Sequence, residues 1–165
     1  SRGEGPPLVL LHGLACGQRM WTRQARALAR SYTVVTYDQR GHGASSAPSE
    51  AAQYSPGHLT RDLAGLLDAL GIGRCALVGF SMGGGPALGL ALAQPQRVSR
   101  LVLADVGAGA ENPAAIQALA RRWTALGRTR GIAALAEEML TSDLFRTYAG
   151  RGPRQRRHMR ALIAA

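Results

Sequence analysis

The chain has 165 residues, of which 46% are hydrophobic, and its 20 basic and 10 acidic side chains give a formal net charge of +10. This hydrophobic content excludes an intrinsically disordered chain, and no apolar run approaches the roughly 18 residues of a transmembrane helix. All basic residues are arginine, and six of them lie in residues 146–165, without the interleaved aromatic or glycine residues of a nucleic-acid site. We therefore expect neither a nucleic acid nor a membrane as a partner.

Four short apolar runs predict buried strands. They are Pro7–His12, Thr33–Asp38, Cys75–Phe80 and Leu101–Val106. Their nearly continuous apolar character is typical of strands that are covered on both faces, as in a parallel sheet. Helical patterns stand between them, so the order of elements predicts an α/β fold with right-handed crossovers.

Three helices are predicted, one in each interval between consecutive strands. The first spans the apolar positions of Trp21–Leu28. The second begins with Ser55 as N-cap and Pro56 as first helical residue, and it ends near Gly71. The third is predicted over Met82–Gln94, because a proline follows directly and cannot continue a helix.

The rhythm of strands and helices changes in the last third of the chain. A helix is predicted to open at Asn112 and to end at Gly127, and another carries apolar residues from Ile132 to Met139 at helical spacing. A further helix is predicted in Arg151–Ala165. Two successive amphipathic helices without a strand between them indicate an inserted helical layer or the beginning of a second subdomain.

The segment GFSMG, residues 79–83, carries the strongest functional signal. It fits the pattern G-x-S-x-G and stands between a predicted strand and a predicted helix, as a nucleophile elbow requires. The turn is so tight that glycine must flank the serine. Its geometry points the Ser81 hydroxyl out of the carboxyl edge of the sheet, above the positive end of the next helix. The simpler interpretation is a glycine-rich turn with an incidental serine, which the flanking strand and helix disfavour.

The segment His12-Gly13-Leu14-Ala15 follows the first predicted strand directly. A loop at this place can present a backbone N–H toward Ser81. We expect the N–H groups of Leu14 and Met82 to form an oxyanion hole, in which both residues matter by position and not by side chain. His12 itself can be read as a partly buried loop histidine.

The loop after the second predicted strand reads YDQRGHGAS. Asp38 and His42 can be taken for a catalytic pair. A structural role is the preferred interpretation: Asp38 and Arg40 would hydrogen-bond the tight loop at Gly41 and Gly43, which supports the site.

The segments PPLVLLHG, YDQRGHGAS and GFSMGG occur in the order and at the places that α/β-hydrolases use, and the chain resembles the N-terminal and central part of such an enzyme. The pattern is similar to enol-lactonase-like, esterase and cofactor-free haloperoxidase-like members. The resemblance implies a parallel-sheet core with strands equivalent to the third to sixth, in spatial order 4-3-5-6. Residues 1–110 would form this partial core, and residues 111–165 the start of a helical cap.

By this resemblance the protein is a serine hydrolase acting on a small carboxylic ester or lactone. Serine at the elbow argues against the haloalkane dehalogenase and epoxide hydrolase branches, which use aspartate there. Perhydrolase or haloperoxidase-like activity and C–C bond hydrolysis stay open as alternatives, as does an inactive fragment that only binds a ligand or partner. No cluster of Cys, His and carboxylate has metal-ligand spacing, so we expect no metal and no organic cofactor.

The acid and base of the triad are expected outside this chain. His158 is the only histidine after Ser81, and it stands among arginines in RRHMR with no preceding strand. Asp105, at the tip of the last predicted strand, is the best-placed carboxylate. Eight strands at roughly 30 residues per βα step need about 240 residues, so 165 residues predict a partial hydrolase core.

Two expectations concern the surroundings of the protein. Cys16 and Cys75 form no disulfide framework, which favours a reducing, cytoplasmic compartment. A four-strand parallel sheet with two open edges would also tend to self-associate.

Overall fold

The computed structural model describes residues 1–107 and 113–163. The chain divides into two compact units, Ser1–Val106 and Gly107–Ala165. Among the described residues no helix combines the length and the hydrophobicity that crossing a bilayer requires.

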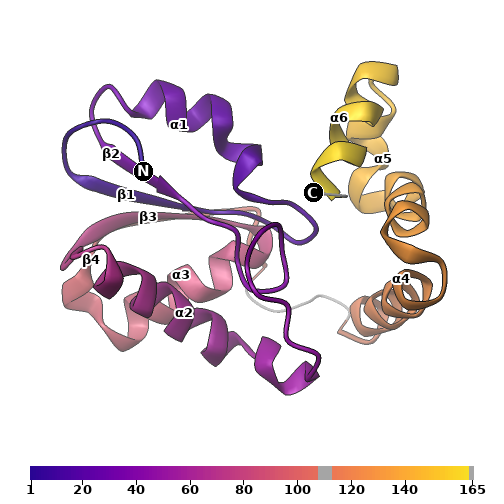
Figure 1. Ribbon diagram of the computed structural model, residues 1–165, viewed down its shortest axis with the longest axis horizontal. Helices are drawn as coiled ribbons and strands as arrows, with labels where there is room; N and C mark the ends of the chain where they lie inside the picture. Colours follow the sequence, from indigo (N-terminus) through magenta and orange to yellow (C-terminus); the bar gives the residue numbers. More distant parts are fainter. Residues whose placement is uncertain (108–112, 164–165) are drawn as a thin grey trace. The chain divides into compact units, whose positions relative to one another are not determined.

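Strands and helices alternate in the first unit, as the sequence predicts (Figure 1). Its elements are β1 (Pro7–Leu11), the 3-10 turn η1 (Gln18–Trp21), α1 (Thr22–Leu28), β2 (Thr33–Thr36), η2 (Ala51–Tyr54), α2 (Pro56–Ala69), β3 (Cys75–Phe80), η3 (Ser81–Gly83), α3 (Gly84–Ala93), η4 (Pro95–Arg97) and β4 (Val98–Ala104). The four strands form one parallel sheet in the order β2-β1-β3-β4. This order is 4-3-5-6 in the family numbering, so the predicted α/β core is confirmed.

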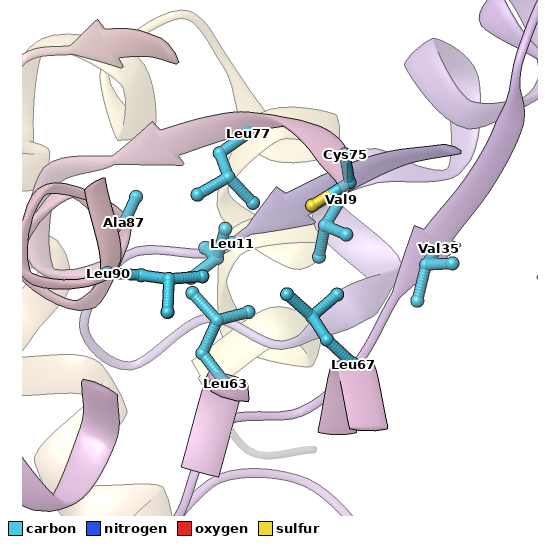
Figure 2. Close-up of a cluster of buried hydrophobic side chains, with 9 residues drawn as sticks. All are labelled: Val9, Leu11, Val35, Leu63, Leu67, Cys75, Leu77, Ala87 and Leu90. Carbon is cyan, nitrogen blue, oxygen red and sulfur yellow. The ribbon is translucent and has the colours of Figure 1, made fainter. Parts of the chain in front are cut away.

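The two faces of the sheet bury alternate residues of β1, because successive side chains of a strand point to opposite sides. Figure 1 shows α1 on one face and α2 and α3 on the other. On the α1 face, Leu8 and Leu10 pack with Trp21. The larger cluster on the other face consists of Val9, Leu11, Val35, Leu63, Leu67, Cys75, Leu77, Ala87 and Leu90 (Figure 2). Burial on both faces explains why the strand sequences are almost continuously apolar.

Helix α2 begins and ends as predicted. The Ser55 hydroxyl oxygen accepts a hydrogen bond from the His58 N–H at 3.4 Å, and Pro56 is the first helical residue. Beyond the last turn, Gly71 adopts a left-handed conformation with φ of +65°. Capping and chain termination therefore follow from local chemistry at both ends.

Several predicted boundaries are wrong by a few residues. β4 begins at Val98 instead of Leu101 and ends at Ala104, and its early residues pair with the start of β3 across a register shift. β1 ends at Leu11 instead of His12, and β2 ends at Thr36 instead of Asp38. His12 and Asp38 belong to the loops that follow these strands. The segment predicted as a helix from Met82 opens instead with the turn η3, so that α3 begins two residues later.

β4 lies at one edge of the sheet and is the least buried strand. Val102 is 52% exposed and Leu103 is 40% exposed, and no further strand pairs with β4 within the described residues. β2 forms the opposite edge. Self-association through these edges stays a prediction.

The second unit is helical. Its elements are α4 (Pro113–Thr141), α5 (Asp143–Ala149) and α6 (Pro153–Ile163). The predicted break at Gly127 is wrong: the helix axis breaks at Gly131, which has φ of 79° and ψ of 174°. A Cβ at Gly127 would lie in ordinary contact, 3.5 Å from the Leu135 side chain, so the helix continues through this glycine. The predicted start at Asn112 lies outside the described residues.

Candidate active site

Ser81 occupies a strained backbone conformation at the carboxyl end of β3. Its φ is +49°, in the left-handed region that costs a non-glycine residue about 1–2 kcal/mol. The residue is half-buried, and its hydroxyl has no hydrogen-bond partner in the part of the chain that the structure describes. A non-glycine residue held at positive φ between a strand and a helix is the backbone geometry that the sequence pattern predicts for this serine.

Two glycines make this turn possible because side chains would collide with backbone. A Cβ at Gly79 would lie 2.6 Å from the Gly83 carbonyl oxygen and from the Gly84 Cα. A Cβ at Gly83 would lie 2.6 Å from the carbonyl oxygen of Leu11 and 2.7 Å from that of His12. The turn is therefore pressed against the end of β1, which brings the loop after β1 to the serine.

The loop after β1 lies directly beside Ser81. A Cβ at Gly13 would be 2.9 Å from the Phe80 ring and 3.4 Å from the Ser81 Cβ. The next residue, Leu14, is 47% exposed, and its backbone N–H has no acceptor among the described residues. The structure thus brings the predicted residues Leu14, Ser81 and Met82 to one edge of the sheet.

His12 is completely buried and has a structural role. Its Nε2 accepts a hydrogen bond from the Gln39 N–H at 2.9 Å, which requires the proton to sit on Nδ1. Nδ1 then donates to the Gly13 carbonyl oxygen at 2.9 Å. Burial lowers the pKa of this imidazole below its ordinary value, so the neutral form is favoured. Sequence reasoning placed His12 in the loop but expected only partial burial.

Gln39 was missed by the sequence analysis. Its side-chain Nε2 donates to the His12 carbonyl oxygen at 2.6 Å, and it is almost completely buried. It therefore fastens the end of β1 to the loop after β2 by two hydrogen bonds. A glutamine between two predicted structural residues carries no sequence signal for this role.

His42 and Asp38 do not form a catalytic pair. His42 Nε2 accepts a hydrogen bond from the Ala15 N–H at 3.2 Å, and its Nδ1 lies 3.2 Å from the Arg40 carbonyl oxygen. Its ring meets the ring of His12 edge to face, with the centroids 4.9 Å apart. Both ring nitrogens of His42 are thus engaged with backbone.

Asp38 organises the neighbouring loops, as the structural interpretation predicts. Its carboxylate accepts hydrogen bonds from the Gln18 N–H at 2.7 Å, the Gln18 side-chain amide at 3.0 Å and the Ala44 N–H at 3.3 Å. Burial raises the pKa of Asp38, but these donors more than offset that effect, and the pKa lies below its ordinary value. Its carbonyl oxygen accepts a hydrogen bond from the Ser45 hydroxyl at 2.5 Å.

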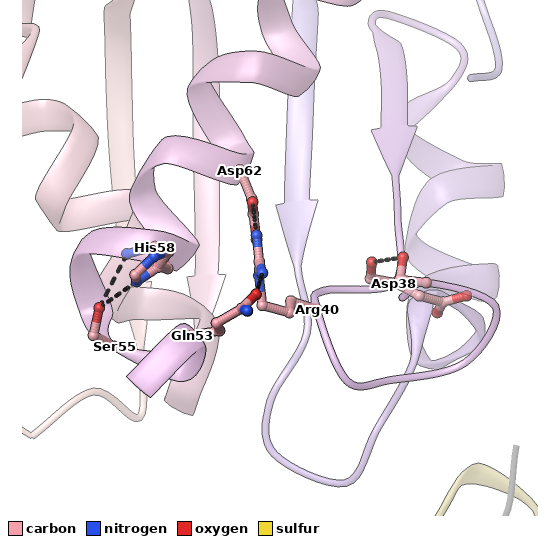
Figure 3. A network of polar contacts seen from close by, with 7 residues as sticks. Asp38, Arg40, Gln53, Ser55, His58 and Asp62 are labelled. Atoms are coloured by element: carbon pink, nitrogen blue, oxygen red, sulfur yellow. Dashed lines mark hydrogen bonds and ion pairs between the residues drawn. The ribbon is translucent and has the colours of Figure 1, made fainter. Parts of the chain in front are cut away.

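Arg40 does not bind the glycine loop as the sequence analysis expected. Its guanidinium forms two hydrogen bonds to the Asp62 carboxylate on α2, at 2.7 Å and 2.6 Å, and a third to the Gln53 side chain at 3.2 Å (Figure 3). The planar, forked guanidinium suits this two-point contact. Arg40 therefore ties the loop after β2 to helix α2.

Asp105 and His158 occupy different surroundings. The last paired residues of β3 and β4 are Phe80 and Ala104. Ser81 directly follows Phe80 and Asp105 directly follows Ala104, so both residues lie at the same edge of the sheet. Asp105 is exposed and also has a positive φ, +54°. His158 lies exposed on α6 of the second unit. No group of three or more metal-ligating side chains occurs in residues 1–107 and 113–163.

Known proteins share both the sequence and the fold of this chain. Residues 6–157 match a family model described as "alpha/beta hydrolase fold". An epoxide hydrolase from Caballeronia sordidicola is 43% identical over 98 residues, which are 59% of this chain and 30% of that protein.

Solved structures extend the likeness to nearly the whole chain. A hydrolase from Pseudomonas aeruginosa PA01 superposes with a TM-score of 0.85 at 34% identity, covering 99% of this chain and 60% of that one. The enol-lactonase from Burkholderia xenovorans LB400 gives a TM-score of 0.81 at 34% identity, with 98% and 60% covered. The chain thus spans about 60% of these structures and corresponds to a partial core. With the parallel sheet in the predicted order and the family match over residues 6–157, the chain belongs to the alpha/beta hydrolase fold family.

Proposed function

We propose that this protein is a serine hydrolase that acts on a small carboxylic ester or lactone, with Ser81 as its nucleophile. The observation that carries the proposal is the left-handed conformation of Ser81 between β3 and α3. Strain at a single non-glycine residue persists only where the surrounding structure enforces it, and such residues cluster at active sites. Here the packing of Gly79 and Gly83 enforces it.

In the proposed reaction the Ser81 Oγ attacks the acyl carbon while a general base takes its proton. The backbone N–H groups of Leu14 and Met82 hydrogen-bond the oxygen that becomes negatively charged. The N-terminus of α3 adds its positive partial charge at the same edge. The alcohol or enol leaves with a proton, and water then attacks the acyl-enzyme, which releases the acid and restores the serine.

Esters and lactones are preferred over epoxides and haloalkanes as the substrate class. Both classes superpose over nearly the whole chain, but the enol-lactonase does so with a TM-score of 0.81 at 34% identity and an epoxide hydrolase structure with 0.71 at 29%. The residue at the turn is serine, and the resemblance of the sequence implies aspartate there in the epoxide hydrolase and dehalogenase branches. A serine nucleophile leads to an acyl-enzyme, which fits a carbonyl substrate.

The general base and its orienting carboxylate lie, in this proposal, outside the chain. His12 and His42 have both ring nitrogens engaged with backbone, and His158 is exposed on α6. The chain spans about 60% of the related structures, which leaves room for these residues elsewhere in a complete fold. Asp105 is the described carboxylate that starts nearest to Ser81 along the sheet edge.

A second candidate function is ligand binding without turnover. It is favoured by one observation: no imidazole contacts the Ser81 hydroxyl within the described residues.

A cytoplasmic location is supported by the two cysteines, which are both free and buried.

The test is labelling of this chain with a fluorophosphonate probe, beside the variants Ser81→Ala and Ser99→Ala. Ser99 is exposed on β4 and away from the turn, so its variant controls for nonspecific labelling. Because the base is placed outside the chain, Ser81 should react slowly. We therefore expect slow labelling that Ser81→Ala abolishes and Ser99→Ala leaves unchanged, with little turnover of a short nitrophenyl ester. Equal labelling of all three proteins, with folding verified by circular dichroism, would favour binding without catalysis. Rapid ester turnover that depends on Ser81 would contradict the placement of the base outside the chain.

A further inference from the structure

One buried and one partly buried hydrogen bond join the loops after β1 and β2 in a reciprocal manner. The side chain of His12, from the first loop, accepts the Gln39 N–H of the second at 2.9 Å. The side chain of His42, from the second loop, accepts the Ala15 N–H of the first at 3.2 Å. The two rings meet edge to face at 4.9 Å. We call these two side chains, together with the backbone groups that they bind at Gly13, Ala15 and Gln39, the histidine brace.

The brace anchors two consecutive peptide groups of the loop beside Ser81. In a planar trans peptide the C=O and the following N–H point in opposite directions. The His12 Nδ1–H holds the Gly13 carbonyl at 2.9 Å, which turns the Leu14 N–H to the opposite side. His42 holds the next peptide through the Ala15 N–H. Because the peptide groups on both sides of the Leu14 Cα are held, the Leu14 N–H has little freedom to rotate.

Ala15 shows that this anchoring opposes a local preference. Its φ is +55°, a region that an alanine avoids unless the surroundings impose it. The His42 bond is the side-chain contact that the structure gives to the Ala15 backbone, and a second hydrogen bond, from the Cys16 N–H to the Gly13 carbonyl at 3.2 Å, closes the same turn. The loop is therefore held in a shape that its own sequence does not favour.

We propose that His42 is a positioning residue of the oxyanion hole: through its bond to Ala15 it holds the Leu14 N–H beside Ser81. This inference rests on the proposed serine hydrolase function. His42 accepts a hydrogen bond at Nε2, so it acts in its neutral form with the proton on Nδ1, facing the Arg40 carbonyl. A protonated His42 has no lone pair for Ala15, and the brace opens.

Other ionisable groups surround His42 on both loops. His12 faces its ring directly, and Asp38 acts on the charge of His12 from the start of the second loop. Arg40 contributes only its carbonyl, since its guanidinium is bound to Asp62. Tyr54, from η2, packs against the neighbouring Gly41. Burial and, to a smaller extent, the neighbouring His42 ring, 4.9 Å away, lower the pKa of His12, which favours its neutral form.

The first experiment reads the brace without any catalysis. Long-range 1H–15N NMR spectra of the chain near about pH 8 report the tautomer of each histidine, and backbone spectra report the Leu14 and Ala15 amides. We expect both brace histidines as Nδ1–H tautomers. Replacing His42 by alanine should shift the Ala15 and Leu14 amide signals together. An Nε2–H tautomer of His42, or amide signals that ignore the replacement, would overturn the proposal.

The second experiment compares two substitutions by their rate of Ser81 phosphonylation. In His42→Gln the side-chain oxygen can accept the Ala15 N–H and does not titrate, whereas His42→Ala has no acceptor. We expect His42→Ala to slow labelling on the order of 10-fold, a fraction of the roughly 10²–10³ that loss of an oxyanion donor costs. His42→Gln should label within about threefold of the native chain. The matched control is His58→Gln, at a half-buried histidine on α2, and it should change neither the labelling rate nor the Leu14 amide signal.

The outcomes separate the two proposals. Labelling that survives Ser81→Ala contradicts the hydrolase function, and the NMR spectra then still decide whether the brace holds Leu14. Ser81-dependent labelling that is equally fast in His42→Ala, His42→Gln and the native chain contradicts the positioning role and leaves the hydrolase function standing.

Discussion

Gly83 offers the sharpest single test of how the site is built. A Cβ at this position would lie 2.6 Å from the Leu11 carbonyl oxygen and 2.7 Å from that of His12. Both oxygens belong to the buried end of β1, which is paired on one side with β2 and on the other with β3. The His12 carbonyl also receives the Gln39 side chain at 2.6 Å. The substitution Gly83→Ala therefore cannot be absorbed by rotation of a side chain.

The magnitude follows from this geometry. Ordinary contact begins near 3.4 Å, so β1 and the turn must separate by nearly 1 Å. Overpacking of a rigid interior typically costs about 1–3 kcal/mol, and alanine recovers about 0.5–1 kcal/mol of backbone entropy relative to glycine. We expect Gly83→Ala to lower the free energy of unfolding by about 1 kcal/mol, which corresponds to roughly 2–4 °C in melting temperature for a chain of this size.

A matched control lies two residues away. A Cβ at Gly85 would meet nothing within 4 Å, and the residue is exposed in α3. Gly85→Ala should therefore leave stability unchanged or raise it by up to about 0.5 kcal/mol. Urea unfolding followed by circular dichroism measures both variants. If Gly83→Ala were as stable as Gly85→Ala, the close approach of the turn to β1 would be refuted.

Four further outcomes follow from single sites. Gly65→Ala, exposed in the middle of α2 with open space around it, should raise the free energy of unfolding by about 0.5–1 kcal/mol, and a loss in urea unfolding would contradict this. Ser81→Gly should be more stable than Ser81→Ala by about 1 kcal/mol, because glycine relieves the positive φ, and both should resist the fluorophosphonate probe. Asp38→Asn should lower the free energy of unfolding at neutral pH, because the lowered pKa of Asp38 means that its ionised form stabilises the fold. The difference from the native chain should vanish as the pH falls below about 4 and the carboxylate becomes protonated. A difference that does not change with pH would argue against this role. Because the pKa of His12 is lowered in the folded chain, the unfolded chain takes up its proton at a higher pH. The urea concentration at the midpoint of unfolding should therefore fall as the pH drops below about 6.5. An NMR titration that gives His12 its ordinary pKa would speak against burial of the neutral ring.

The strands and their order were predictable because their signals are local and repeated. β3 has the bounds that its apolar run predicts, and the placement of Ser81 at its end follows from two flanking glycines. The missed start of β4 at Val98 has a physical cause. Ser99 and Arg100 are polar and exposed, so the run of hydrophobic residues begins later than the ladder of hydrogen bonds.

The loops around the site were less predictable because their contacts join distant residues. Ala15 has a positive φ although alanine gives no sign of it in the sequence, and its partner His42 stands 27 residues further along. Gln39 lies at the same separation from His12. Such pairs form only because β1 and β2 are neighbours in the sheet, which brings the two loops to one edge. Arg40 binds Asp62 on α2, 22 residues further along, which also lies outside the range of local sequence patterns.

The central place of β1 has a consequence for the order of folding. β1 is the first strand of the chain, yet it acquires its second neighbour only when Leu8 pairs with Ala76 on β3. Parallel strands cannot be joined by a tight hairpin. Closing the loop between Leu8 and Ala76 therefore costs conformational entropy before the contacts between the strands can stabilise the sheet. Contacts of large sequence separation also slow folding. Because Ser81 adopts its strained turn against the end of β1, the reactivity of this serine should arise late during refolding, and its rate of appearance would time the completion of the sheet.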